Sequence, residues 1–215
     1  MTEIYPSLLA ADSGKIDQLV KELEPFCPGF HIDIMDNTFV PNTGISVEKT
    51  NHIATITYRQ LWVHLMVEQP ELYLNQLQLP AGSLVTFHIE SKKSTKSLIK
   101  NIIEKKWRAG IAISPKTGVA EIMGFLDTID QVLIMSVEPG FSGAQFLKET
   151  LDKIDPLLGI RQSQSLTFKI GMDGGVDLEN IKNIAERGID QVAIGSGIFK
   201  YPNVAKAYQL LSERV

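Results

Sequence analysis

Histidine and carboxylate side chains recur in short patterns whose spacing suits metal binding. The patterns are HIDIMD at 31–36, HLM at 64–66, and an aspartate at 173 that directly precedes two glycines. Side chains at i and i+2 of a strand share one face, so the first pattern can bring its histidine and aspartate together. Mixed nitrogen and oxygen ligation favours Zn²⁺, with Fe²⁺, Mn²⁺ or Co²⁺ as alternatives. The sequence predicts one divalent cation per subunit, with four ligands: His31, Asp33, His64 and Asp173.

Other interpretations of the histidines have to be weighed against this one. Taken alone, His31 or His64 is more simply explained as a hydrogen-bonded, half-buried side chain. When both histidines occur together with two carboxylates at three strand ends, metal binding becomes the better explanation. His88 also ends an expected strand, but a structural role is at least as strong an explanation for it. His52 lies in an expected helix, and we assign it no role in the site.

Glycine-rich turns late in the chain form a second candidate site, one for an anion. They are PGFSG at 139–143, GG at 174–175 and GSG at 195–197. Glycines let backbone N–H groups approach an anion closely, and phosphate sites in barrel enzymes are frequently built after the seventh and eighth strands. A single glycine pair is usually only a turn, whereas successive glycine turns at those positions predict a phosphate-binding site.

The elements that position these residues alternate regularly along the chain. Short apolar, β-branched runs predict strands, and the segments between them show helical spacing. Consecutive parallel strands need crossover connections, so this series favours a (β/α)8 TIM barrel formed by residues 1–215 as a single domain. A doubly wound open sheet is the alternative, but residues 10–14 lack the glycine fingerprint of a dinucleotide site. The expected strands are Glu3–Leu8, Gly29–Met35, Gln60–Met66, Ser83–His88, Arg108–Ile113, Gln131–Ser136, Thr167–Met172 and Gln191–Ile194.

Composition narrows the class of protein further. The formal net charge of -4 gives no electrostatic reason to expect a nucleic-acid partner. The lone cysteine, Cys27, excludes an internal disulfide framework. The amino-terminal segment does not look like a signal peptide, and no run approaches the ~18 apolar residues typical of a membrane span. We therefore expect a cytoplasmic protein with no membrane partner.

Six motifs together resemble those of the ribulose-phosphate 3-epimerase family. They are YPSLLAAD at 5–12, HIDIMDNTFVPN at 31–42, VHLMVEQPE at 63–71, MSVEPGFSGAQF at 135–146, MDGGV at 172–176 and AIGSGIF at 193–199. The resemblance runs in order over nearly the whole chain. It implies a metal-dependent barrel of the ribulose-phosphate-binding type that inverts the carbon next to a ketone, interconverting D-ribulose 5-phosphate and D-xylulose 5-phosphate in the pentose phosphate pathway. It also implies a homo-oligomer, because the family often forms one.

The resemblance further implies individual roles within the site. Asp33 and Asp173 match the two acid/base groups, one for each face of a planar enediolate. His31 and His64 match the other metal ligands. The resemblance implies that the phosphorylated ketose is contacted by Ser7, His64, Met35, Met66, Met135, Gly140, Phe141, Ser142, Gly143, Gly174, Gly175, Gly195 and Ser196.

Several positions depart from the family pattern and keep other activities open. Asn37 stands where glycine is usual, residues 43–47 differ, and Ser142 and Ala144 replace common glycine and glutamine positions. These loops can shape substrate fit, so a hexulose-phosphate 3-epimerase acting on allulose 6-phosphate is the nearest alternative. A decarboxylase of similar fold would carry lysine where Met35 stands. A noncatalytic phosphosugar-binding barrel is the third alternative.

Overall fold

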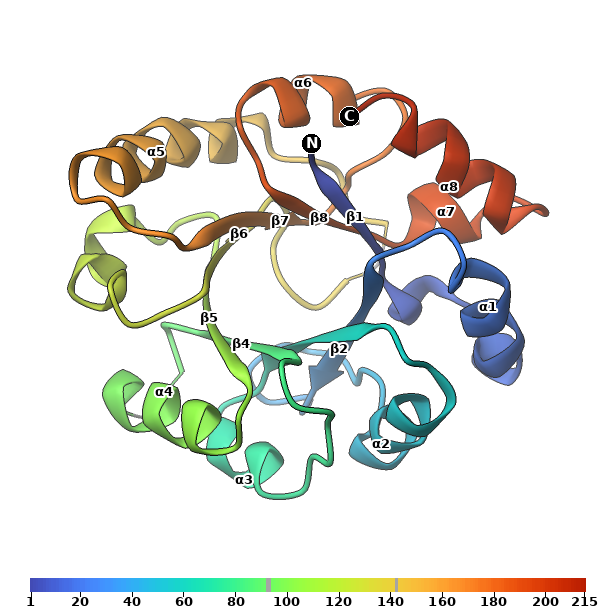
Figure 1. Ribbon diagram of the computed structural model, residues 1–215, viewed down its shortest axis with the longest axis horizontal. Coiled ribbons are helices and arrows are strands. Elements are labelled where there is room, and N and C mark those ends of the chain that lie inside the picture. Colours follow the sequence, from blue (N-terminus) through green and yellow to red (C-terminus); the bar gives the residue numbers. More distant parts are fainter. Residues whose placement is uncertain (92–93, 142) are drawn as a thin grey trace.

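Eight parallel strands form a ring in the computed structural model, and helices surround it (Figure 1). The structure describes residues 1–91, 94–141 and 143–215. The expected (β/α)8 barrel is therefore confirmed, and the open doubly wound sheet is excluded. The strands are β1 (Glu3–Pro6), β2 (Gly29–Met35), β3 (Gln60–Met66), β4 (Leu84–His88), β5 (Arg108–Ile113), β6 (Gln131–Met135), β7 (Lys169–Asp173) and β8 (Gln191–Ile194).

The register of the sheet decides which side chains meet at the mouth of the barrel. The strand order is β1-β8-β7-β6-β5-β4-β3-β2, and a parallel bridge between Ser7 and His31 closes the ring. Asp33 pairs with His64 between β2 and β3, and Met135 pairs with Asp173 between β6 and β7. Residues distant in sequence are therefore neighbours at the carboxyl ends of the strands.

The connecting helices pack on the outside of the ring and bury a shell of aliphatic side chains against it. Four strands differ from expectation at one or both ends. β1 ends at Pro6, because the chain turns into a short 3-10 helix at Leu8–Ala10, β4 begins at Leu84, and β6 ends at Met135. β7 begins at Lys169 and ends at Asp173. The helices are α1 (Ile16–Leu23), α2 (Val47–Ile56), α3 (Pro70–Leu74), α4 (Thr95–Glu104), α5 (Ile154–Ser163), α6 (Ile181–Glu186), α7 (Ser196–Phe199) and α8 (Val204–Ser212). No described helix is both long and apolar enough to cross a bilayer.

A chain of buried hydrogen bonds forms a floor inside the barrel, below the mouth. The Trp62 indole N–H donates to Thr86 at 3.0 Å, the Thr86 hydroxyl donates to the Gln131 amide at 2.8 Å, and Gln131 donates to Gln191 at 2.9 Å. Gly110 leaves room for this chain, because a Cβ there would lie 2.4 Å from the Thr86 hydroxyl. Satisfied polar networks of this kind are rigid, so the floor gives the site above it a fixed base.

Candidate metal centre and pocket

The four predicted metal ligands come together at the mouth of the barrel. His31 and Asp33 lie on β2, His64 on β3 and Asp173 at the end of β7, and one ligand atom from each lies within 4.8 Å of all the others. His31 and His64 are fully buried, Asp33 is almost fully buried, and the Asp173 side chain is 15% exposed. Asp173 is thus the most exposed of the four candidate ligands.

Asp33 lies at the centre of the cluster. Its Oδ1 is 3.1 Å from His64 Nδ1, its Oδ2 is 3.3 Å from His31 Nδ1, and the Ser7 hydroxyl donates to Oδ2 at 2.9 Å. Asp173 Oδ2 is 3.6 Å from the same Nδ1 of His64. The two carboxylates and two imidazoles therefore face one small volume.

The electrostatics of the cluster keep its central carboxylate charged. Burial raises the pKa of Asp33, but the neighbouring His31 ring and the hydrogen bond with His64 outweigh it and hold that pKa well below its usual range. Burial lowers the pKa of His64, yet hydrogen bonds to Asp173 and Asp33 raise it to about 9. Negative charge at this mouth therefore attracts a cation, whether a proton or a metal ion.

His31 provides an independent test of whether a metal ion suits these residues. Both of its ring nitrogens are buried and make no hydrogen bond within the described part of the chain, because Nδ1, although 3.3 Å from Asp33 Oδ2, is not in hydrogen-bonding geometry with it. The edge of the ring packs against Trp62, with centroids 4.6 Å apart and planes at 87°, so the barrel floor holds its orientation. An unpaired buried polar atom is costly, and a cation on one nitrogen removes that cost. The arrangement fits a divalent cation.

A pocket opens directly above this cluster and receives most of the residues predicted to contact substrate. Asp33 and Asp173 both line it. His31 and His64 do not line it, because they are buried beneath its floor. Ser142 lies outside the described residues. The predicted contacts that line the pocket are Ser7, Met35, Met66, Met135, Gly140, Phe141, Gly143, Gly174, Gly175, Gly195 and Ser196.

Backbone geometry explains the glycines on one side of the pocket. Gly174 has φ +117° and Gly175 has φ +62°, and a Cβ on Gly175 would lie 2.8 Å from the Phe146 backbone nitrogen. Gly195 precedes α7, which Ser196 begins. On this wall of the pocket the backbone therefore lies open, without covering side chains, so that its N–H groups can approach an anion closely.

Hydrogen bonds fix the loop after β2, where the sequence departs from the family pattern. Asn37 adopts φ +57°, a left-handed geometry that asparagine tolerates better than most residues other than glycine. The Asp36 carboxylate accepts backbone hydrogen bonds from Thr38, Phe39 and Glu68, so it shapes the loop. The Asn42 side chain donates to the Gly140 carbonyl at 3.0 Å, which ties this loop to the turn after β6.

Four pocket residues were not predicted from sequence: Leu9, Val137, Val176 and Ala193. All four are apolar and carry no chemical signature that separates them from ordinary core residues. Their position one or two residues from a predicted contact was the only available signal. They add apolar surface to the wall of the pocket.

Comparison with known proteins agrees with this geometry. The model of the family described as "Ribulose-phosphate 3 epimerase family" matches residues 3–199. A ribulose-phosphate 3-epimerase of Treponema pallidum is 33% identical over 197 residues, covering 91% of this chain and 90% of the relative. One from Escherichia coli is 33% identical over 206 residues, covering 94% and 91%.

Solved structures with low sequence identity share the fold. The 3-hexulose-6-phosphate synthase of Salmonella typhimurium aligns with a TM-score of 0.70 at 15% identity, covering 99% of this chain and 97% of that one. Orotidine 5'-monophosphate decarboxylase of Sulfolobus solfataricus aligns with a TM-score of 0.68 at 12% identity, covering 99% and 97%. Both support the barrel architecture alone.

Proposed function

This chain belongs to the ribulose-phosphate 3-epimerase family of isomerases, and we propose that its pocket interconverts D-ribulose 5-phosphate and D-xylulose 5-phosphate. The observation that carries the proposal is the convergence of Asp33 and Asp173 on one pocket from strands that are not neighbours in the sheet. Inversion of a carbon needs one acid/base group for each of its faces. We infer that residues 1–215 act as one catalytic domain.

The two carboxylates divide the proton transfers between them. One carboxylate removes the C3 proton of the bound ketose, and the other returns a proton to the opposite face of the resulting enediolate. The epimer that is bound decides which of the two acts first. Ser7 donates to Asp33 and so fixes the orientation of that carboxylate, leaving its remaining oxygen lone pairs for ligand and substrate.

His31, Asp33, His64 and Asp173 would hold the divalent cation. When bound, it supplies Lewis-acid stabilisation of the negative charge that develops on the substrate oxygens. The mixed imidazole and carboxylate ligands favour Zn²⁺, with Fe²⁺, Mn²⁺ and Co²⁺ as alternatives.

Two walls of the pocket serve the intermediate and the phosphate. Met35, Met66 and Met135 are at most 7% exposed and surround the reacting position with polarizable side chains that carry no acidic proton. The backbone at Gly174, Gly175, Gly195 and Ser196 would bind the phosphate. A bound phosphate positions the reacting carbon and helps exclude water.

Replacing Gly175 by alanine tests the phosphate wall. The new Cβ would meet backbone atoms of Phe146 and Ala144 within 2.9 Å, so the wall must move. We expect KM for the phosphorylated ketose to rise about tenfold with a smaller change in kcat, because the interaction is made in ground and transition states alike. Gly159→Ala, in α5 with nothing within 4 Å, is the matched control and should leave KM unchanged. An unchanged KM for Gly175→Ala would show that the phosphate does not bind to the backbone at Gly175.

The substrate is tested by comparing two ketose phosphates with the metal-loaded protein. We expect kcat/KM for D-ribulose 5-phosphate to exceed that for D-allulose 6-phosphate by about tenfold or more, the usual discrimination by pocket size. Turnover of D-allulose 6-phosphate alone would support the proposed 3-epimerisation but would contradict D-ribulose 5-phosphate as the substrate. Binding of both sugars without turnover of either would make the barrel a noncatalytic binding protein.

The homo-oligomeric state stays a prediction from sequence.

A further inference from the structure

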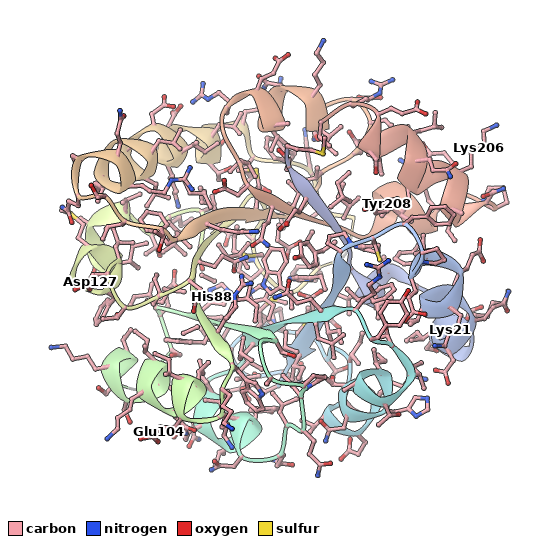
Figure 2. The ribbon with its side chains drawn as sticks, viewed as in Figure 1. Lys21, His88, Glu104, Asp127, Lys206 and Tyr208 are labelled. Atoms are coloured by element: carbon pink, nitrogen blue, oxygen red, sulfur yellow. The ribbon has the colours of Figure 1, made fainter. Side chains whose placement is uncertain are left out.

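A third buried histidine stands behind the metal cluster. His88 ends β4, the strand next to the one that carries His64, and both rings are fully buried. Their Nε2 atoms are 3.0 Å apart, and the rings stack with centroids at 5.0 Å and an interplanar angle of 24°. Figure 2 shows His88 on the inner side of the strand ring, while the labelled Glu104 and Lys206 lie in the outer layer. His88 does not line the pocket, so it does not touch substrate.

The contact between the two rings constrains where their protons lie. His64 directs Nδ1 at the carboxylates of Asp33 and Asp173, so Nδ1 is its ligand atom. A neutral imidazole carries one proton, so ligation through Nδ1 places the proton of His64 on Nε2. That N–H can donate to His88 only if Nε2 of His88 is bare, which places the proton of His88 on its Nδ1.

Glu90 fixes this arrangement from the other end. Its Oε2 lies 3.1 Å from His88 Nδ1 and accepts from it, while its Oε1 accepts from the Ser114 backbone N–H at 2.9 Å and from the Thr117 hydroxyl. Burial raises the pKa of Glu90, but its hydrogen bonds to His88 and Thr117 lower that pKa to about 2, so this group is a charged acceptor. The Lys153 ammonium donates to the carbonyls of Ser114 and Thr117 and holds the loop that positions Glu90.

We propose that His88 and Glu90 are positioning residues that set the tautomer of His64 and thereby aim its bare Nδ1 at the cation. This inference rests on the proposed metal site. All the hydrogen bonds run in one direction, from His64 to His88 to Glu90, because Glu90 has no proton to donate. Partners of this kind orient a ligating histidine and raise its basicity, and their loss typically weakens metal binding about 10- to 100-fold.

We call the hydrogen bonds from His64 to His88 and from His88 to Glu90 the relay. Glu90→Gln reverses the direction of both hydrogen bonds while keeping a side chain of the same shape. The donors from Ser114 and Thr117 require an oxygen at the Oε1 position, so the new amide nitrogen takes the place of Oε2 and donates to His88 Nδ1. His88 must then carry its proton on Nε2, and His64 must accept it, which places a proton on the ligand atom of His64. We expect the dissociation constant for Zn²⁺, measured by chelator competition without substrate, to rise about 10- to 100-fold.

Thr117→Val is the matched control. It removes a hydrogen bond to Oε1 of the same carboxylate but leaves Oε2 and His88 in place. If the substitutions merely loosened the loop, Zn²⁺ binding would weaken in both variants. If the relay orients His64, Zn²⁺ binding should weaken in Glu90→Gln alone. Circular dichroism of the metal-free proteins verifies that both variants are folded.

A second pair of variants decides the matter if Glu90→Gln does not fold. The amide oxygen of His88→Gln can accept from His64 Nε2, while His88→Leu offers no acceptor. We expect Zn²⁺ binding close to wild type in the former and at least about tenfold weaker in the latter. Wild-type protein that binds no Zn²⁺ would overturn both the metal site and the relay. Tight binding by wild type with equal affinity in Glu90→Gln, or in His88→Leu, would overturn the relay alone.

Discussion

Asp173→Asn is expected to lower kcat for epimerisation about 10³-fold or more and to leave the barrel folded. Positioned acid/base groups contribute about 10²- to 10⁴-fold, and asparagine neither removes the C3 proton nor returns one. The Asp173 side chain is 15% exposed, so its amide replacement is tolerated structurally. The measurement is kcat in both directions at saturating metal, with circular dichroism as the test of folding.

Because Asp33 remains, the Asp173→Asn variant should still catalyse part of the reaction, the exchange of the C3 proton with solvent. In deuterated water, Asp33 can still exchange the C3 proton of one epimer, so one of the two ketose phosphates should incorporate deuterium without being inverted. Asp127→Asn is the control, because Asp127 is exposed and does not line the pocket. Wild-type kcat in Asp173→Asn would show that the second proton carrier is another group.

Removal of the divalent cation is expected to reduce turnover about 10³-fold, the equivalent of several kcal/mol of lost charge stabilisation. Stoichiometric return of one cation per chain should restore it, with Zn²⁺ first among the ions tested. Because neither His31 nitrogen has a hydrogen-bond partner in the described residues, we also expect the cation to raise the melting temperature of the protein. The contrary result is full activity in protein that retains less than about a tenth of an equivalent of metal, since bound metal is then not needed for the reaction.

The sequence predicted the architecture and the convergence of the four candidate ligands because both leave periodic signals. All eight strands were located, since each is a short apolar run whose ends carry polar residues. Alternation within HIDIM placed His31 and Asp33 on one face, and the parallel register then brought His64 beside Asp33. These features follow from strand geometry and need no tertiary detail.

Other features depend on tertiary contacts that leave no local pattern. Ile103 has the same helical spacing as its apolar neighbours, yet it is 51% exposed, because the face of α4 that packs on the barrel carries Leu98, Ile99 and Ile102. The relay through Glu90 could not be predicted, because its partners Ser114 and Thr117 lie in the loop that follows the next strand, β5. The tie between Asn42 and the Gly140 carbonyl likewise joins residues 98 positions apart.

The central claim is that this pocket moves a proton at C3 of D-ribulose 5-phosphate with a bound divalent cation. It is tested most directly by proton NMR of that sugar in deuterated water, with chelated protein and again after the cation is returned. The account predicts that the C3 proton signal disappears and deuterated D-xylulose 5-phosphate accumulates only in the metal-loaded sample. Retention of the C3 proton with every cation tried, by folded protein that binds the sugar, would contradict it.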